Sequence, residues 1–291
     1  MHLANAFGLL WHSDLPLDFL APAPASAESP DVTIRQVATL SPRIGGIAIN
    51  RGWVYDNGFR FVWSDIAAFD VFEGNRIDVA PLTGWTGALP WPFYSTVAAL
   101  LLAWRGQLPL HACSVAIDGT AILLCGASGA GKSSLCAGLV ARGAGLLCDD
   151  LTVIAPGPAG RQALALPGRP GIRLFREIAD QLLAPIKQAV PDDIRHKVMA
   201  CWPDHKTGQP LPVARIIVLQ DRPLPLDPRA RLQLLQAQLF RPRWLAGLPG
   251  ADFRAAQLRG LLATARMQVL APLGPFSLTR LADLCAEVEG G

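Results

Sequence analysis

Charged residues are scarce in this chain, and lysine is very rare. Asp, Glu, Lys and Arg make up 17% of its 291 residues, and lysine occurs only at positions 132, 187, 197 and 206. The formal net charge of +3 is too small to indicate a nucleic-acid-binding protein. Because 51% of the residues are hydrophobic, the chain has the composition of a folded protein with a sizeable core.

Membrane-spanning and secretory features are also lacking. No apolar run is long and uninterrupted enough to span a bilayer, and the first residues lack the basic start of a signal peptide. The six cysteines form no CxxC pair, and four of them lie in apolar runs, which is typical of buried thiols in a reducing compartment. We therefore expect a cytoplasmic protein whose partners include neither a membrane nor a nucleic acid.

Turn residues and alternating hydrophobicity indicate a β-rich N-terminal part. The Pro/Ala/Ser segment 21–30 predicts a loop or linker. Hairpins are predicted at 52–63, around Asn57-Gly58, and at 68–79, so that roughly residues 31–82 form a small antiparallel β unit. Residues 90–106 then change to helical spacing and predict a helix that ends at Gly106.

The remainder of the chain predicts an α/β core with a buried sheet, because strands alternate with a helix. The expected strands are 108–117, 120–126, 145–155 and 215–219. The expected helices are 132–143, 228–240, 251–265 and 277–288.

One motif carries specific chemistry, and it lies between the strand 120–126 and the helix 132–143. Residues 126–133, GASGAGKS, match the pattern G-x-x-x-x-G-K-[ST] without a gap. Glycines let phosphate oxygens approach backbone N–H groups, and the helix start attracts the same anion. The alternative to a phosphate-binding loop is a surface glycine loop without a ligand. The pattern predicts a nucleotide site made by Gly126, Ser128, Gly129, Ala130, Gly131, Lys132, Ser133 and Ser134.

Paired carboxylates follow on the next expected strand. Asp149 and Asp150 are adjacent, so on a strand they would point to opposite faces. One could face a Mg²⁺ ion and the other an acceptor hydroxyl. The alternative without a function is that both carboxylates lie at a solvated strand end. His111 lies fifteen residues before Gly126, and by itself it would be interpreted as a core histidine.

Residues 110–154 resemble the catalytic core of the HPr kinase/phosphorylase family, which has a histidine, a glycine loop and an Asp-Asp pair at these distances. The resemblance implies a P-loop kinase core of the HPr kinase/phosphoenolpyruvate carboxykinase type, at 91–291, with a small β-rich domain at 1–90 in front. It implies ATP and Mg²⁺ as cofactors. It further implies Asp149 as the base, Lys132 at the phosphates, Ser133 and Asp150 at the metal, and His111 close to the phosphates.

Departures from that family narrow the expected substrate. Ser134 stands where HPr kinases usually have glutamate, and no segment of the EIRG type follows. The segments 165–175 and 191–199 look more like HPr-kinase-related proteins of peptide-modification clusters, some of which phosphorylate the C-terminal serine of a lasso-peptide precursor. The expected partner is thus a peptide or small protein with an acceptor serine, and the resemblance also allows a homo-oligomer. The alternatives are a regulatory HPr-type serine kinase and a non-catalytic nucleotide-dependent peptide-binding module.

Several weaker patterns have both a functional and a bland interpretation. His196, Cys201 and His205 have spacing suited to a zinc site, but no fourth ligand is nearby, and a polar loop explains them as well. Asp192-Asp193 predict a helix start, and Lys197 beyond them could reach a phosphate or a carboxylate. Arg169 and Arg173 lie either at the transferred phosphoryl group or on the surface. The arginines of 222–266 line either a groove for a peptide or a solvated helical face.

Overall fold

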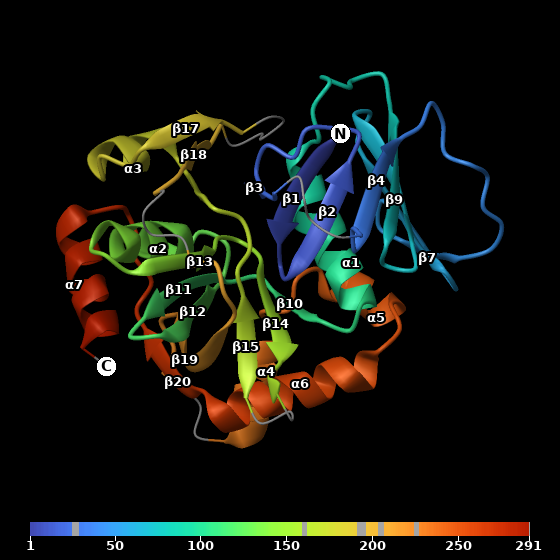
Figure 1. Ribbon diagram of the computed structural model, residues 1–291. Helices are drawn as coiled ribbons and strands as arrows, with labels where there is room; N and C mark the ends of the chain where they lie inside the picture. The colour runs from blue at the N-terminus through green and yellow to red at the C-terminus, as the bar shows by residue number, and fades with distance from the viewer. Residues whose placement is uncertain (25–28, 159–161, 191–195, 203–206, 224–226, 291) are drawn as a thin grey trace. The chain divides into compact units, whose positions relative to one another are not determined.

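The computed structural model describes residues 1–24, 29–158, 162–190, 196–202, 207–223 and 227–290 (Figure 1). It is a mixed α/β structure with several sheets and helices. The contacts within the chain divide it into two compact units. Unit 1 comprises Met1–Pro109 and Phe240–Arg254, and unit 2 comprises Leu110–Leu239 and Ala255–Gly291. The division at residue 90 that the resemblance implies stays a prediction.

Unit 1 contains a nine-stranded sheet in the order β3-β1-β2-β4-β9-β8-β7-β6-β5. Its strands are β1 (His2–Ala6), β2 (Leu9–Ser13), β3 (Ala21–Pro22), β4 (Val32–Gln36), β5 (Ile47–Ile49), β6 (Gly52–Tyr55), β7 (Gly58–Trp63), β8 (Ala67–Phe72) and β9 (Arg76–Pro81). The expected antiparallel unit over roughly 31–82 is therefore wrong in two respects. The sheet begins at residue 2, and β4 runs parallel to both β2 and β9.

Both predicted hairpins are present, and one differs in its turn. Tyr55 pairs with Gly58, so the two turn residues are Asp56 and Asn57, and Gly58 opens β7. A side chain at Gly58 would put its Cβ 1.8 Å from the carbonyl oxygen of Val71 on β8, and its φ is +147°. Glycine is thus needed there for the close approach of two strands, not for the turn itself. Segment 21–30 begins with β3, and its residues 25–28 lie outside the described part.

The expected helix at 90–106 is confirmed, but its first part is a π-helix. It consists of η1 (Phe93–Val97) followed by α1 (Ala98–Trp104), and all residues from 93 to 103 are buried. Phe93 contacts Trp11 and Phe69 from the sheet, with ring centroids 6.4 and 6.0 Å apart. This aromatic packing gives unit 1 a core of its own.

The second large sheet is an eight-stranded mixed sheet in the order β10-β14-β15-β19-β12-β11-β13, with β20 paired to β19, and all of its strands except β10 lie wholly in unit 2. Its strands are β10 (Leu108–Leu110), β11 (Cys113–Ile117), β12 (Thr120–Gly126), β13 (Gly145–Cys148), β14 (Thr152–Pro156), β15 (Ala163–Leu166), β19 (Leu211–Leu219) and β20 (Arg266–Leu270). The central strands β12, β19 and β20 are parallel. The expected strand 215–219 is confirmed as the second half of β19.

Two strands that the sequence predicts as continuous are broken. The expected strand 108–117 is interrupted at His111 and Ala112, and the expected strand 145–155 is interrupted at residues 149–151. The hydroxyl of Thr152 donates to the carbonyl of Ala112 at 2.9 Å, so the two breaks lie side by side. His111, Asp149 and Asp150 therefore lie on irregular backbone and not on strands.

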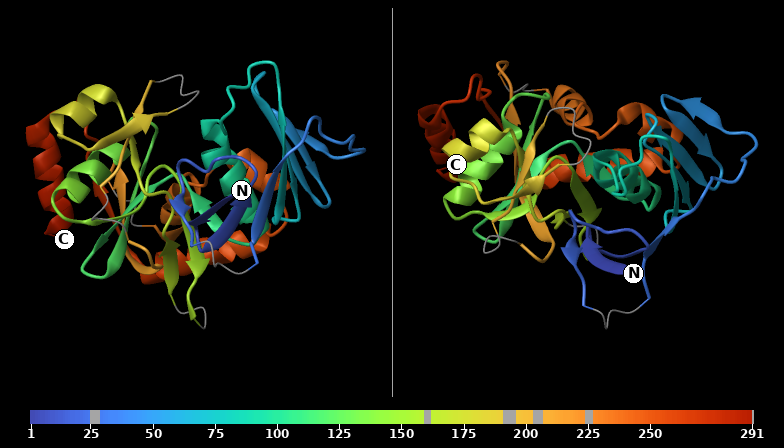
Figure 2. Two further views of the ribbon diagram at one scale, coloured as in Figure 1. Left: turned by 45° about the horizontal axis from the view of Figure 1, so that its top comes forward. Right: turned by 90° about the horizontal axis from the view of Figure 1, so that it is seen from above.

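Helix α2 (Lys132–Ala141) follows the glycine loop, and α7 (Leu278–Glu289) packs beside it (Figures 1 and 2). The packing is close, because a Cβ at Gly138 would lie 3.0 Å from the Sγ atom of Cys285. Arg142 and Glu289 form an ion pair where the two helices end. Both expected helices are confirmed, and together they fix α2 against the apolar core of unit 2.

The remaining elements complete the chain. They are a three-stranded sheet of β16 (Ile172–Leu174), β18 (Val198–Ala200) and β17 (Ile186–Ala189), and the helices α3 (Arg176–Gln181), α4 (Pro228–Gln236), α5 (Pro242–Gly247) and α6 (Ala251–Thr264). Helix α4 is shorter than the expected 228–240, since Leu239 forms a bridge with Leu110. In the described part of the chain, no helix combines the length and apolar character needed to cross a membrane.

Candidate functional site

The glycine loop joins the end of β12 to the start of α2, as its sequence predicts. Gly126, Gly129 and Gly131 have φ angles of +141°, +89° and +95°, which side chains rarely adopt. At Gly126 a Cβ would lie 2.8 Å from the carbonyl oxygen of Leu219, because the loop leaves the sheet directly against β19. Gly131 is the N-cap of α2, so the positive end of the helix dipole lies at this loop.

Lys132 is folded back over the loop. Its side chain is buried, with 6% exposure, and its ammonium donates to the carbonyl oxygens of Gly126 and Ala127 at 2.8 and 3.1 Å. The Nζ atom is also 3.3 Å from Nε2 of His111. The loop therefore holds a positive charge inside a ring of backbone groups, which suits a bound anion.

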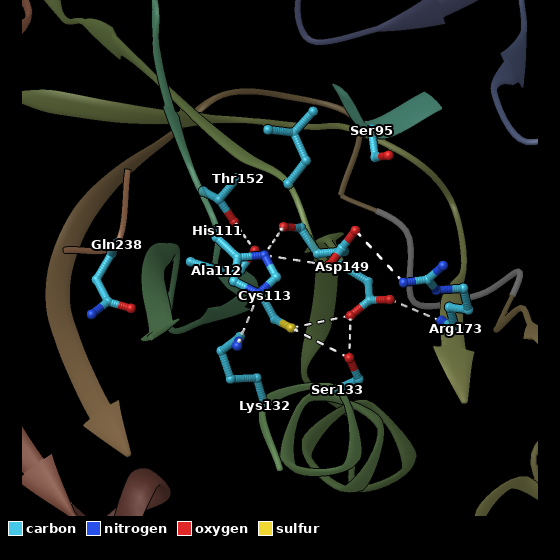
Figure 3. Close-up of polar contacts among 12 residues, drawn as sticks. Ser95, His111, Ala112, Cys113, Lys132, Ser133, Asp149, Thr152, Arg173 and Gln238 are labelled. Atoms are coloured by element: carbon cyan, nitrogen blue, oxygen red, sulfur yellow. Dashed lines mark hydrogen bonds and ion pairs between the residues drawn. The ribbon is translucent and has the colours of Figure 1, made fainter. Parts of the chain in front are cut away.

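Asp149 is the buried carboxylate of the site, with 1% exposure (Figure 3). One oxygen, Oδ1, accepts from the Ser133 hydroxyl at 2.8 Å and from the Cys113 thiol at 3.1 Å. The other oxygen, Oδ2, accepts from the backbone N–H of Arg173 at 2.9 Å. Burial raises the pKa of the Cys113 thiol well above its ordinary value, so the thiol keeps its proton and acts as a donor.

Asp150 points elsewhere and is partly exposed, at 16% of its side chain. Its φ of +68° is left-handed, which turns its carboxylate away from its neighbour. Its Oδ2 lies 3.9 Å from a guanidinium nitrogen of Arg173. Burial acts to raise the pKa of Asp150, but the positive charges around it, those of Arg173 and Arg169 first, outweigh this and lower the pKa.

His111 connects Asp150 with Lys132. Its Nδ1 lies 3.2 Å from the backbone oxygen and 3.4 Å from Oδ1 of Asp150. Burial lowers the pKa of His111, and Lys132 acts in the same direction, whereas Asp150 raises it less than these two lower it. The ring is therefore neutral near pH 7, with Nδ1 as the donor and Nε2 accepting from the Lys132 ammonium.

Two arginines and a lysine lie on the Asp150 side. Arg169 is buried and donates to the backbone oxygen of Asp149 at 2.6 Å. Lys197 lies 4.7 Å from the centroid of the exposed Phe175 ring, and its charge contributes to the lowered pKa of Asp150. Of the weaker sequence candidates, Arg169, Arg173 and Lys197 are thus brought to the site.

The other expected residues take varied positions. Ser128 and Gly129 are exposed on the loop, Ala130 is half-buried, and Ser134 is buried in the first turn of α2. Asp192, Asp193 and His205 lie outside the described residues. Within the described ranges, no three His, Cys, Asp or Glu side chains gather as a metal-ion site, and this includes His196 and Cys201.

The structure adds two residues that no local pattern indicates. Gln238 accepts from the backbone N–H of Gly126 through its Oε1 at 2.9 Å, from 112 positions away in the chain. Leu273 donates its backbone N–H to Ala130 at 3.1 Å and covers Gly131, where an added Cβ would lie 2.5 Å from the Leu273 Cβ. Both come from segments that were expected to be helix ends or loops, so only the fold identifies them.

The donor set can be compared with the needs of Mg²⁺ and a nucleotide. Mg²⁺ prefers oxygen ligands and keeps several waters, so it needs only one or two protein groups. The adjoining Ser133 hydroxyl and Asp149 carboxylate fit this requirement. The glycine backbone, which side chains would obstruct, and the Lys132 ammonium fit a polyphosphate.

Comparison with known proteins adds little. No family model matches the chain, and no curated protein matches it in sequence. Among solved structures it is similar to the Hpr(Ser) kinase/phosphatase from Coxiella burnetii, with 24% identity and a TM-score of 0.27 over 42% of this chain and 71% of that one. A similarity this weak carries no weight for function, which is argued below from the site.

Proposed function

We propose that this protein is an ATP- and Mg²⁺-dependent kinase that phosphorylates a serine hydroxyl on a peptide or small protein. The observation that carries the proposal is the meeting of three groups at the start of α2: the Lys132 ammonium, the Ser133 hydroxyl and the Asp149 carboxylate. Phosphoryl transfer needs a cation for the phosphates, oxygen ligands for the metal and a carboxylate for the acceptor proton. A nucleotide-binding loop alone would need only the first two.

The glycine loop and α2 bind and orient the triphosphate in this proposal. When bound, ATP supplies the phosphoryl group and Mg²⁺ offsets its negative charge. The loop amides and the Lys132 ammonium stabilise the charge on the transferred group. His111, which touches Lys132, holds that ammonium at the loop.

The two carboxylates are assigned the two remaining roles, accepting the proton and binding Mg²⁺. Following the resemblance, we propose Asp149 as the base that accepts the serine proton and Asp150 as the carboxylate toward Mg²⁺. The contacts taken alone favour the reverse assignment, because the Asp149 carboxylate accepts from the Ser133 hydroxyl at 2.8 Å whereas Asp150 is the more exposed of the two. A base removed from the site costs about 10²–10⁴-fold in rate, and a metal ligand removed raises the Mg²⁺ requirement, so the two are separable.

The acceptor that we propose is the C-terminal serine of a lasso-peptide precursor. Support comes from the sequence resemblance of 165–175 and 191–199, and from the positive charge of Arg169, Arg173 and Lys197 beside Asp150. Cationic groups there suit an acceptor that carries its own negative charge next to the serine, such as a terminal carboxylate. A regulatory HPr-type kinase and a non-catalytic peptide-binding module are the alternatives.

The experiment incubates the full chain with ATP, Mg²⁺ and three acceptors: a lasso-precursor peptide ending in serine, its C-terminal amide, and HPr protein. Mass spectrometry measures the phosphate added, and titration calorimetry measures ATP binding. Asp149→Asn and Asp150→Asn are compared at several Mg²⁺ concentrations. The two variants control for each other, since they are adjacent and remove the same charge.

The outcomes separate the candidates. We expect phosphate on the free-acid peptide, less on the amide, and none on HPr. Transfer to HPr alone would favour the regulatory kinase. ATP binding without transfer to any acceptor would favour the binding module, and no binding of ATP with Mg²⁺ would refute the nucleotide site altogether.

A further inference from the structure

Gln238 lies in the turn after α4 and is buried, with 7% exposure. Both ends of its side-chain amide are engaged, since Oε1 accepts from Gly126 N–H at 2.9 Å and Nε2 donates to the Leu234 carbonyl at 3.2 Å. Its backbone oxygen accepts from His111 N–H at 2.7 Å. One residue thus contacts both the first residue of the glycine loop and the histidine of the site.

These contacts form a closed ring of hydrogen bonds. Gly126 donates to the Gln238 side chain, Gln238 accepts from His111, His111 accepts from Lys132, and Lys132 donates to Gly126. Three of the four residues in the ring, Gly126, His111 and Lys132, belong to the site that the proposed function uses. Gln238 is the fourth, and it comes from outside the motif.

The link matters because Gly126 is itself buried, so its N–H has no access to water if Gln238 is removed. A buried amide without a partner is costly, and the peptide would turn to find one. Such a turn of the Cys125–Gly126 peptide would change the φ angle of Gly126, which is +141° in the structure, and would thereby displace the carbonyl of the next peptide, the Gly126 oxygen that accepts from the Lys132 ammonium at 2.8 Å. Buried hydrogen-bonded networks of this kind depend on every member being satisfied.

We infer that Gln238 is a positioning residue for the proposed kinase site. Its side chain fixes the Cys125–Gly126 peptide at the start of the glycine loop, and through the φ angle of Gly126 it fixes the next peptide, whose carbonyl holds the Lys132 ammonium for the phosphates. The inference rests on the proposed function only in its last step, since the ring exists without a nucleotide. Gln238 itself need not touch the substrate.

The test uses Gln238→Met, which keeps the side-chain length but loses the acceptor, in the full chain. Gln236→Met, at the exposed end of the same helix, is the matched control. Gln238→Glu is the conservative variant, since it keeps an acceptor oxygen for Gly126. Hydrogen exchange of the peptide covering residues 122–134 is followed without nucleotide, and ATP–Mg²⁺ binding is followed by calorimetry.

We expect Gln238→Met to speed exchange at Gly126 and to weaken ATP binding about tenfold, the effect of one lost buried hydrogen bond. Gln236→Met should match wild type in both measurements. Gln238→Glu should keep slow exchange at Gly126, a pattern that lost packing would not produce. Equal exchange and equal ATP affinity in Gln238→Met and Gln236→Met would overturn the inference.

Failure of the proposed function gives a different result. If wild type binds no ATP, the nucleotide site is refuted, while the exchange data still decide whether Gln238 holds the loop. If wild type binds ATP and Gln238→Met exchanges faster but binds equally well, the ring is structural and the positioning role is refuted.

Discussion

Replacing Asp149 with Asn changes one buried carboxylate into a neutral group of the same shape. The carboxylate accepts from Ser133, Arg173 N–H and Cys113, which occupy both oxygens. An Asn side chain has one acceptor oxygen and an NH₂ group that can only donate. Either the Arg173 amide loses its acceptor, or the Ser133 hydroxyl loses its acceptor and must rotate to accept from the NH₂ group.

The magnitude follows from these contacts. A part-buried donor without a partner costs about 1–3 kcal/mol, and a neutral acceptor weakens the bond that remains by about 1 kcal/mol. Release of a buried charge from its desolvation penalty offsets part of this cost. We expect Asp149→Asn to lower the free energy of unfolding by about 2 kcal/mol.

Asp150→Asn is the matched comparison at the next position. Asp150 is partly exposed, and its side-chain contacts are longer, 3.4 Å to Nδ1 of His111 and 3.9 Å to Arg173, so its loss should cost less than about 1 kcal/mol. Urea unfolding is followed by circular dichroism, because among the eight tryptophans only Trp202 belongs to unit 2. Equal destabilisation by the two variants, or a larger effect at Asp150, would refute the reasoning.

Three further predictions concern the loop and its histidine. Gly131→Ala should lower the melting temperature by about 5 °C or more, because φ is +95° and a Cβ would lie 2.5 Å from the Leu273 Cβ. The loss should be smaller when Gly131→Ala is made in a Leu273→Gly background, which lacks that Cβ, and an equal loss in both backgrounds would contradict the contact. Lys132→Ala should raise the Kd for ATP at least about tenfold by calorimetry, and an unchanged Kd would remove the lysine from the site. The folded protein lowers the pKa of His111 from 6.5, so the neutral ring stabilises the fold above pH 6.5, and this stability is lost as the pH falls through the lowered pKa. In His111→Gln the free energy of unfolding should therefore fall less steeply with decreasing pH. Parallel pH profiles of the unfolding free energy for wild type and variant would refute this prediction.

The glycine loop was predictable because all its chemistry lies in eight consecutive residues. A strand before it, a helix after it and glycines at fixed spacing are local signals, and the structure agrees with them. The same holds for the two hairpins, although the first turn is formed by Asp56 and Asn57, one residue before the expected Asn57-Gly58. Where the signal is local, the sequence predicts the structure well.

The breaks beside His111 and Asp149 were not predictable from the same patterns. Each lies between two apolar stretches that read together as one buried strand, and burial on both faces of a sheet hides any change in direction. Asp150 reaches a left-handed φ of +68° with no glycine to indicate it. The orientation of the two carboxylates depends on this irregular backbone. The expectation that they point to opposite faces assumed a regular strand and therefore could not predict their orientation.

Site residues that are far apart in the chain were not predicted for a different reason. Gln238 and Leu273 meet the glycine loop through single hydrogen bonds across more than a hundred positions. No spacing rule connects such residues, because only the path of the chain brings them together. The N-terminal strands β1 and β2 were missed likewise, since their pairing with the rest of the sheet includes a parallel neighbour.

Unit 1 is assembled from two separate stretches of chain, and this has a consequence for synthesis on the ribosome. Trp244, from the second stretch, packs against Phe59 and Phe61 of the first, with ring centroids 6.0 and 5.9 Å apart. A nascent chain that has grown only to residue 239 holds all nine strands of unit 1 but lacks this tryptophan. Those strands must wait for translation of residues 110–239 before Trp244 can join their aromatic core, and unit 2 in turn is complete only after residues 255–291 have followed.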